Sequence, residues 1–227
     1  MLGTRPGQEG YGERRMTTTF PDISLSTERL VLRPLEVADI PPFTEMMNDE
    51  LVTAWTTAPH PYTEGDAHDW ITRAAPAERL RGRGIVLAVT EFLTQRLVGT
   101  VHLRHVDRRV RSAELSCVVA PWARGEGYAC EAVVALAQWL FGDQRFERLE
   151  MRTAAGNTAA QQVAQKTGCI SEGVLRGARI ARTRTEDGSW AEFRTDLIVW
   201  SLLPEDLEGV GEQLAESGGY PAYSDWN

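Results

Sequence analysis

The chain has 227 residues, of which 42% are hydrophobic and 25% are charged, so it is long enough for one sizeable α/β core. No stretch approaches the roughly 20 consecutive apolar residues of a membrane helix, and residues 1–20 lack the apolar centre of a signal peptide, so we expect a cytoplasmic protein with no membrane partner. Residues 205–227 carry six acidic and no basic residues, which leaves only −2 of the net charge of −8 for the rest of the chain and argues against nucleic-acid binding.

Both ends of the chain differ in composition from its centre. Residues 1–20 are polar and Gly-rich, which predicts a disordered leader, and residues 205–227 form an acidic segment that predicts a flexible tail. We therefore expect a single domain over residues 21–204.

The first half of this domain predicts a strand, two helices and a meander. Residues 29–33 alternate like a strand that Pro34 ends, and a helix is expected over 37–48. A second helix is expected over 66–80, with Thr63 and Asp66 as candidate caps and Pro76 bending or dividing it. Three β-rich segments, 85–91, 96–104 and 113–119, predict an antiparallel meander.

After Pro121 the apolar period becomes helical, and this helix ends near Gly142. A strand over 148–152, a helix over 157–168 and strands over 169–175 and 193–202 follow. The basic run between the last two strands is either a solvated loop or a face that attracts an acidic acceptor; it contains Arg176, Arg179, Arg182 and Arg184. The order predicts an α/β (mixed α+β) fold, with helices on both faces of a central mixed, largely antiparallel sheet.

The turn before the helical segment has the composition of an anion site. Residues 124–129 read Arg-Gly-Glu-Gly-Tyr-Ala and lie between a strand that ends at Val119 and the start of a helix. A helix N-terminus offers unpaired N–H groups and a partial positive charge, and glycines let a phosphate approach the backbone. Gly-x-Gly alone is weak evidence, since many Gly-rich turns only cap a helix.

The pattern Arg124-x-x-Gly127-x-Ala129 resembles the Q/R-x-x-G-x-G/A signature of the GNAT superfamily of N-acetyltransferases, and most closely the group that acetylates ribosomal-protein N-terminal alanines. Further similarities to that group, which together extend the resemblance over about residues 24–204, are Ser26-Thr27-Glu28-Arg29-Leu30, Ala113-Glu114, Asn157, Lys166-Thr167-Gly168-Cys169, Glu172 to Arg176 and Asp196 to Leu203.

The resemblance implies a single GNAT-type domain with two splayed central strands and acetyl-CoA as cosubstrate. It implies that the backbone of one splayed strand aligns the pantetheine arm and that Asn157 hydrogen-bonds this arm. The implied cofactor-binding residues are Cys117, Val118, Val119, Arg124, Gly125, Glu126, Gly127, Tyr128, Ala129 and Asn157. The Glu126 side chain is expected to point to solvent, because a carboxylate repels phosphate.

Acetyl transfer needs a neutral amine, a polarised thioester carbonyl and a proton for the leaving thiolate. Glu114, upstream on the splayed strand, is the candidate general base; its alternative is a structural glutamate. Two positions depart from the related group: Ala160 replaces a serine, and no tyrosine follows in the helix to act as general acid. Solvent or a Ser or Thr hydroxyl is left for that role. Cys130 is expected to pack the helix rather than carry an acyl group.

We therefore expect an acetyltransferase that moves acetyl to a primary amine by direct attack in a ternary complex. The amine is a peptide N-terminus or a small molecule, an antibiotic included; a non-catalytic acyl-CoA sensor is the alternative from another class. His102 and His105 should face opposite sides of a strand, so we expect no metal. Trp55, Tyr62 and Trp70 are candidates for the acceptor pocket or the core, and a homodimer stays open.

Overall fold

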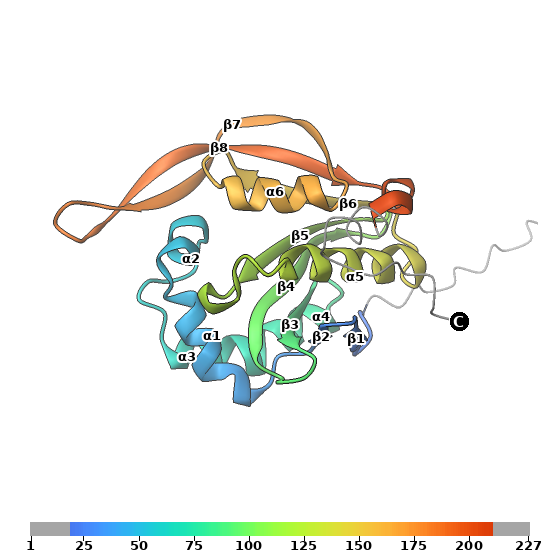
Figure 1. The fold of residues 1–227 in the computed structure, drawn as a ribbon, viewed down its shortest axis with the longest axis horizontal. Coiled ribbons are helices and arrows are strands. Elements are labelled where there is room, and N and C mark those ends of the chain that lie inside the picture. The colour runs from blue at the N-terminus through green and yellow to red at the C-terminus, as the bar shows by residue number, and fades with distance from the viewer. Residues whose placement is uncertain (1–18, 211–227) are drawn as a thin grey trace, which may run out of the picture.

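A computed structural model describes residues 19–210 (Figure 1). One open eight-stranded sheet organises this part of the chain, in the order β1-β2-β3-β4-β5-β6-β8-β7. The strands are β1 (Leu25–Ser26), β2 (Leu30–Arg33), β3 (Ile85–Glu91), β4 (Leu97–Asp107), β5 (Ser112–Val119), β6 (Arg148–Ala154), β7 (Ile170–Arg184) and β8 (Trp190–Leu202). Neighbouring strands are antiparallel except β5 and β6, which run parallel.

The helices connect and cover the strands. They are η1 (Val37–Asp39), α1 (Ile40–Met47), α2 (Glu50–Trp55), α3 (Glu64–Asp69), the π-helical turn η2 (Trp70–Ala74), α4 (Ala75–Leu80), η3 (Pro121–Ala123), α5 (Tyr128–Gly142), α6 (Thr158–Lys166) and η4 (Pro204–Gly209). None of the helices in residues 19–210 is both long enough and apolar enough to cross a membrane.

Both faces of the central sheet are covered. Six of the seven residues of β3, Ile85 to Thr90, are buried whichever way their side chains point, as expected for a strand between two layers. On β5, Cys117 lines a pocket together with residues of α5. The adjacent Ser116 pairs with His102, whose ring contacts Glu78 of α4. The two helices therefore pack on opposite faces, and the expected mixed sheet with helices on both faces is confirmed.

Several expected elements have the predicted bounds. The strand 85–91 and the end of α5 at Gly142 agree with the sequence analysis, and Thr63 with Asp66 forms the reciprocal cap of α3. The helix expected over 66–80 is divided, but not at Pro76 as was predicted. The division lies at the π-helical turn Trp70–Ala74, before Pro76, which occupies the first turn of α4 where its missing N–H costs nothing.

The long hairpin at the end of the chain was not foreseen. Residues 176–184 were expected to form a loop, but β7 continues through them to Arg184 and pairs with β8, and the arm projects beyond the rest of the fold (Figure 1). A register shift between Leu175 and Arg179, with Gly177 at φ 59°, lets the strand resume after the break in pairing.

The expected leader lies outside the described residues except for its last two positions. Phe20 was expected to be disordered, but its ring is 1% exposed and packs against Trp139 and Phe146. The core therefore includes a residue that the sequence analysis had excluded from the fold. At the other end, η4 lies within the segment expected to be a tail, and Val210 is buried beside Gly168. The remainder of that tail lies outside the described residues.

Candidate active site

The central feature of the site is a fork between the two parallel strands. β5 and β6 pair from Ser112 opposite Arg148 as far as Leu115 opposite Met151, and no further. Beyond that point residues 116–119 of β5 pair only with β4, and residues 152–154 of β6 pair only with β8. The edge of β5 that faces the fork therefore has backbone N–H and C=O groups free of strand pairing, which an extended ligand can bind.

The loop that follows β5 leads directly into α5. Gly125 and Gly127 both have left-handed backbones, with φ 86° and 80°, a conformation that costs glycine little and other residues more. Gly127 is the N-cap of α5, and the first backbone bond of the helix runs from the N–H of Glu131 to the Gly127 carbonyl. The N–H groups of the preceding residues point out of the helix end, where its dipole is positive, so the loop fits a pyrophosphate.

A buried carboxylate fixes the position of this loop. Glu131 in the first turn of α5 is 3% exposed and accepts hydrogen bonds from the Thr27 hydroxyl and from Arg29 Nε, the latter at 2.9 Å. Arg29 NH1 also donates to the Glu126 carbonyl at 3.1 Å, and its guanidinium lies over the Tyr128 ring. The segment Thr27 to Arg29 thus holds the loop from outside, while the Glu126 side chain is exposed.

Arg124 does not stand alone at the rim of the loop. Its guanidinium forms an ion pair with Asp49, and the Asp49 carboxylate also accepts from the N–H groups of Leu51 and Val52 at the start of α2. Burial raises the pKa of Asp49, but these hydrogen bonds and the Arg124 charge outweigh it, so the pKa is lowered. The loop is therefore linked to α2, and its arginine charge is already compensated.

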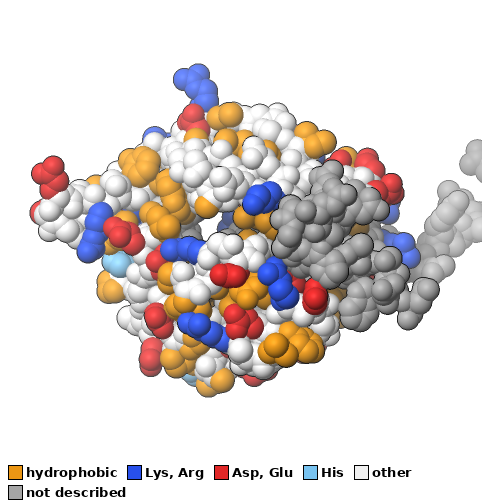
Figure 2. Space-filling model, viewed as in Figure 1, with side chains coloured by type: hydrophobic (Ala, Val, Ile, Leu, Met, Phe, Trp, Pro, Cys, Tyr) orange, Lys and Arg blue, Asp and Glu red, His pale blue; other side chains and the backbone are white. Residues whose placement is uncertain are grey.

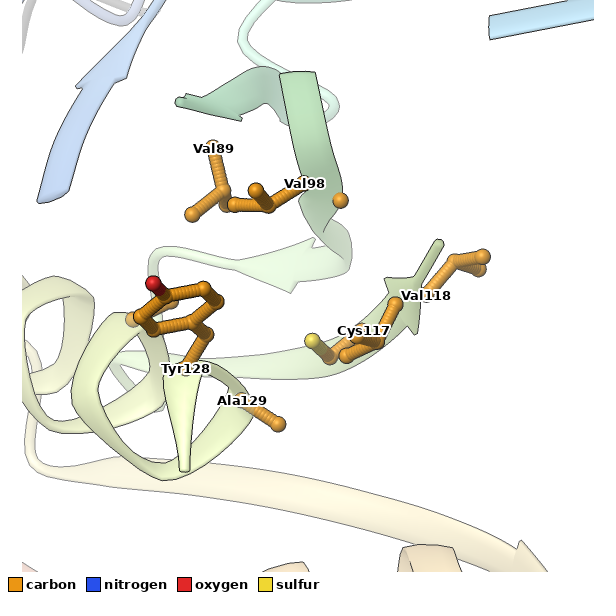
Figure 3. A pocket seen from close by; sticks show the side chains of 9 residues that line it. Val89, Val98, Cys117, Val118, Tyr128 and Ala129 are labelled. Carbon is orange, nitrogen blue, oxygen red and sulfur yellow. The ribbon is translucent and has the colours of Figure 1, made fainter. Parts of the chain in front are cut away.

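A small pocket lies between strands β3, β4 and β5 and the start of α5 (Figure 3). It gathers five of the predicted cofactor residues from two elements, Cys117, Val118 and Val119 on β5 and Tyr128 and Ala129 on α5. Figure 3 shows the Tyr128 ring and the Cys117 side chain on opposite sides of this space. The sequence analysis missed the rest of the lining, which is Val89, Val98, Gly99 and Ala132.

Gly99 has a specific role in this pocket. A Cβ at this position would lie 2.4 Å from the Val118 carbonyl oxygen, so only glycine lets β4 approach β5 this closely. A glycine within an apolar strand was the sequence signal that could have identified the position.

The thiols beside the pocket are poor nucleophiles. Burial and the neighbouring Cys130 raise the pKa of Cys117 to about 12, and burial raises the pKa of Cys130. Both thiols therefore stay protonated at neutral pH, which fits a packing role and does not favour an acyl-cysteine intermediate.

Asn157 lies at the start of α6 and has a structural role there. Its Oδ1 accepts a hydrogen bond from the N–H of Ala160 at 3.1 Å, which makes it the N-cap of the helix. Within residues 19–210 its amide NH2 has no hydrogen-bond partner.

Glu114 lies at the base of the fork and is 4% exposed. Arg104 donates to one carboxylate oxygen from Nε at 3.0 Å and from NH2 at 2.5 Å, and His105 Nδ1 contacts the other at 2.9 Å. Arg152 Nε lies 3.5 Å from the same second oxygen. Burial raises the pKa of Glu114, but the Arg104 charge and the hydrogen bonds outweigh it, so the pKa lies below its usual range.

A scan against family models and searches for similar proteins show which family the chain belongs to. Residues 29–170 match the model of the acetyltransferase (GNAT) domain. The chain belongs to the GNAT acetyltransferase family. An N-acetyltransferase of uncharacterised function, p20 from Bacillus licheniformis, is 26% identical over 187 residues, covering 82% of this chain and 99% of the relative.

Two solved structures share the GNAT fold. RimJ from Mycobacterium smegmatis, in complex with CoA-disulfide, superposes with a TM-score of 0.70 at 20% identity over 83% of this chain and 89% of that one. Spermidine N-acetyltransferase from Vibrio cholerae, in complex with CoA and spermine, gives a TM-score of 0.66 at 19% identity over 80% and 99%. At these identities the likeness shows the fold, and the expected GNAT resemblance is confirmed.

The candidate acceptor aromatics separate into two groups. Tyr62 is buried against Phe43, and Trp70 is partly buried against the core and packs edge-on against His102, so both contribute to the packing of the protein. Trp55 lies at the end of α2, and its ring would be 3.0 Å from a Cβ on Gly156, just before Asn157. Trp55 is therefore the one of the three that lies near the helix that follows the fork.

The histidines hold no metal cluster. His102 contacts Glu78, and His105, with φ 50° in a β-bulge, contacts Glu114, so the bulge interrupts the simple alternation assumed for this strand. Residues 19–210 contain no group of three or more His, Cys, Asp or Glu side chains arranged to hold a metal ion.

Proposed function

We propose that this GNAT protein transfers the acetyl group of acetyl-CoA to a primary amine in a ternary complex. The observation that carries the proposal is the fork, which opens beside the loop of residues 124–129. The unpaired backbone edge of β5, the left-handed glycines of the loop and the N–H groups at the start of α5 together suit one extended ligand with a pyrophosphate at one end. Acetyl-CoA would supply the thioester; the chain must align it and receive the amine.

In this proposal the pyrophosphate is bound by the backbone of residues 124–129. The pantetheine arm runs along Cys117, Val118 and Val119, and the Asn157 amide donates to it. Backbone N–H groups at the fork polarise the acyl carbonyl, because charge develops on that oxygen when the amine attacks. These contacts are mostly backbone, so their position depends on Gly99 and Gly127 rather than on side-chain identity.

We further propose that Glu114 receives the proton of the attacking amine, directly or through a water. The amine nitrogen bonds to the carbonyl carbon, the C–S bond breaks, and the proton released from nitrogen goes to the carboxylate while the thiolate takes a proton from solvent. Because the pKa of Glu114 is lowered, the carboxylate is ionised at neutral pH but is a weaker base than a free glutamate. The Arg104 charge that lowers it also lowers the pKa of a nearby amine, so less basicity is required.

Thiol release from acetyl-CoA, measured with a panel of peptides, polyamines and amino-containing antibiotics, tests this function. We expect release that depends on one class of acceptor. Binding of acetyl-CoA with no acceptor-dependent release by any amine would favour the sensor alternative. Saturation by peptides alone, or by small amines alone, would separate the two enzyme alternatives.

A further inference from the structure

Three strands bring arginines toward Glu114 at the base of the fork. Arg104 comes from β4, Arg152 from β6 and Arg179 from β7. Arg104 and Arg152 both lie within 4.0 Å of the Glu114 carboxylate. The Arg179 charge is close enough to interact with Arg104 and Glu114: burial, then the Arg104 charge, lowers the pKa of Arg179, and Glu114 opposes this.

Around the fork, Arg179 carries a positive charge that no ion pair compensates within residues 19–210. Three arginines and three glutamates form a connected chain of ion pairs, which runs through Arg104, Glu114, Arg152, Glu150, Arg148 and Glu172. The positive and negative charges of this network of ion pairs are equal in number. Arg179 is additional to it, and none of the carboxylates in the described part of the chain forms an ion pair with it. Its hydrogen bond runs from NH2 to the Trp55 carbonyl at 2.5 Å.

A half-buried guanidinium without a carboxylate partner is costly, and a second arginine nearby adds repulsion. The hydrogen bond to the Trp55 carbonyl uses only one of the five N–H donors of the Arg179 guanidinium, and this carbonyl supplies no full negative charge. An anionic group on a ligand would supply both the charge and a bidentate acceptor. Arg179 lies where Trp55 brings α2 to β7, and the Trp55 ring lies against Gly156, two residues after the end of β6 and so beside the open end of the fork.

We propose that the acceptor carries an anionic group, a carboxylate or a phosphate, within a few bonds of its amine, and that Arg179 binds this group. This inference rests on the proposed acetyl transfer and narrows its acceptor to a small anionic amine. The arrangement disfavours a polyamine, whose second cation would meet Arg179 and Arg104, and gives no advantage to a neutral peptide N-terminus.

Matched amine pairs test the inference: alanine against alaninamide, and phosphoethanolamine against ethanolamine. We expect kcat/KM, corrected for the fraction of neutral amine, to be at least about tenfold higher for the anionic member of one pair, mainly through KM. The pair that shows the preference identifies carboxylate or phosphate. Equal kcat/KM within both pairs, or a preference for the neutral members, would overturn the inference and leave acetyl transfer intact.

Arg179→Gln should reduce the preference for the anionic member of the pair to less than about threefold. Arg182→Gln is the matched control, because Arg182 lies on the same strand and donates to the Ala58 carbonyl at 2.8 Å but already pairs with Glu192. It should keep the preference. If both variants change it equally, Arg179 only fastens α2 to β7 and the inference is wrong.

Two further experiments apply if Arg179→Gln does not fold or if no amine is acetylated. If Arg179→Gln does not fold, Arg179→Lys, which keeps the charge but loses the fork geometry, should show a reduced preference with a raised KM. If no amine is acetylated, calorimetry of each amine with the CoA complex decides the inference separately. Tighter binding of the anionic member supports it, and equal binding of both members rejects it.

Discussion

The two sides of the fork are built in different ways. The proposed cofactor side consists of consecutive residues, 124–129, whose backbone conformation follows from two glycines and a helix start. The proposed acceptor side depends on residues far apart in sequence, such as Arg179, whose guanidinium donates one hydrogen bond to the backbone carbonyl of Trp55, 124 positions away. A site made of backbone tolerates changes of side chain, whereas a site made of distant side chains can change its acceptor while the cofactor site stays the same. On the part of the surface that Figure 2 shows in colour, acidic and basic side chains are scattered and form no continuous patch of one sign.

The largest expected effect is on the cofactor side. Gly127→Asp forces a side chain into a left-handed position and places a carboxylate where the pyrophosphate should bind. We expect CoA affinity to fall at least about 100-fold, because access and charge are both lost. Isothermal titration calorimetry measures this.

Gly188→Asp is the matched control for that variant. Gly188 has φ 81°, close to the 80° of Gly127, and a Cβ there meets no atom within 4 Å, but it lies in the β7–β8 turn. It imposes the same strain and charge far from the loop and should bind CoA like the parent. Equal loss of CoA affinity in both variants would show that strain or net charge, not phosphate contact, is responsible.

Glu114→Gln tests the region between the two sides. Turnover should fall about 10- to 100-fold and the pH optimum should rise, because the amine must then lose its proton without a carboxylate, while acetyl-CoA affinity stays within about threefold. Steady-state kinetics across pH measures both. Unchanged turnover at neutral pH would remove Glu114 from the mechanism.

Glu114→Gln should also change how the stability of the protein depends on pH. The folded-state pKa of Glu114 is depressed, so its ion pairs stabilise the fold fully above the ordinary glutamate pKa of about 4.3 and lose this effect as pH falls through the folded-state pKa. Thermal unfolding should show the parent more stable than Glu114→Gln by about 1–3 kcal/mol at pH 7, with the difference shrinking below about pH 4. A difference that is constant down to pH 3 would contradict the ion pairing.

Gly99→Ala tests whether the close approach of β4 to β5 supports cofactor binding or only the fold. The added Cβ would displace Val118, so we expect a loss of about 1–3 kcal/mol in stability and a rise in the acetyl-CoA KM of about tenfold. Gly142→Ala is the control, because a Cβ there meets no atom within 4 Å and alanine favours the helix. If Gly99→Ala loses stability but keeps its KM, the β4–β5 approach supports the fold and not the cofactor.

The smallest effect is expected at the contact that joins the loop to α2. Arg124→Ala should weaken CoA binding only about threefold at low salt and less at high salt, since Asp49 already neutralises this charge and part of it is exposed. Asp49→Asn should have the opposite sign and strengthen CoA binding slightly. A loss of tenfold or more in Arg124→Ala that persists in high salt would assign Arg124 a direct phosphate contact.

The sequence predicted the parts of this site whose physics is local. A strand, a Gly-rich turn and a helix are readable from consecutive residues, so the turn before α5 and most of the order of elements were predicted, whereas β1 and α2 were not. Gly99 was missed because its effect depends on which strand lies opposite. The strand through Arg179 was missed because its charges resemble a solvated loop, and only pairing with β8 holds it extended. Phe20 was missed because one aromatic residue in a polar segment gives no period.

The most direct test of the central claim is an experimental structure of the protein with CoA. We predict the pyrophosphate within hydrogen-bonding distance of the N–H groups of residues 125–129, and the pantetheine arm along residues 117–119 with its sulfur in the fork between β5 and β6. CoA bound elsewhere, or a fork closed by strand pairing beyond Leu115 and Met151, would contradict the account.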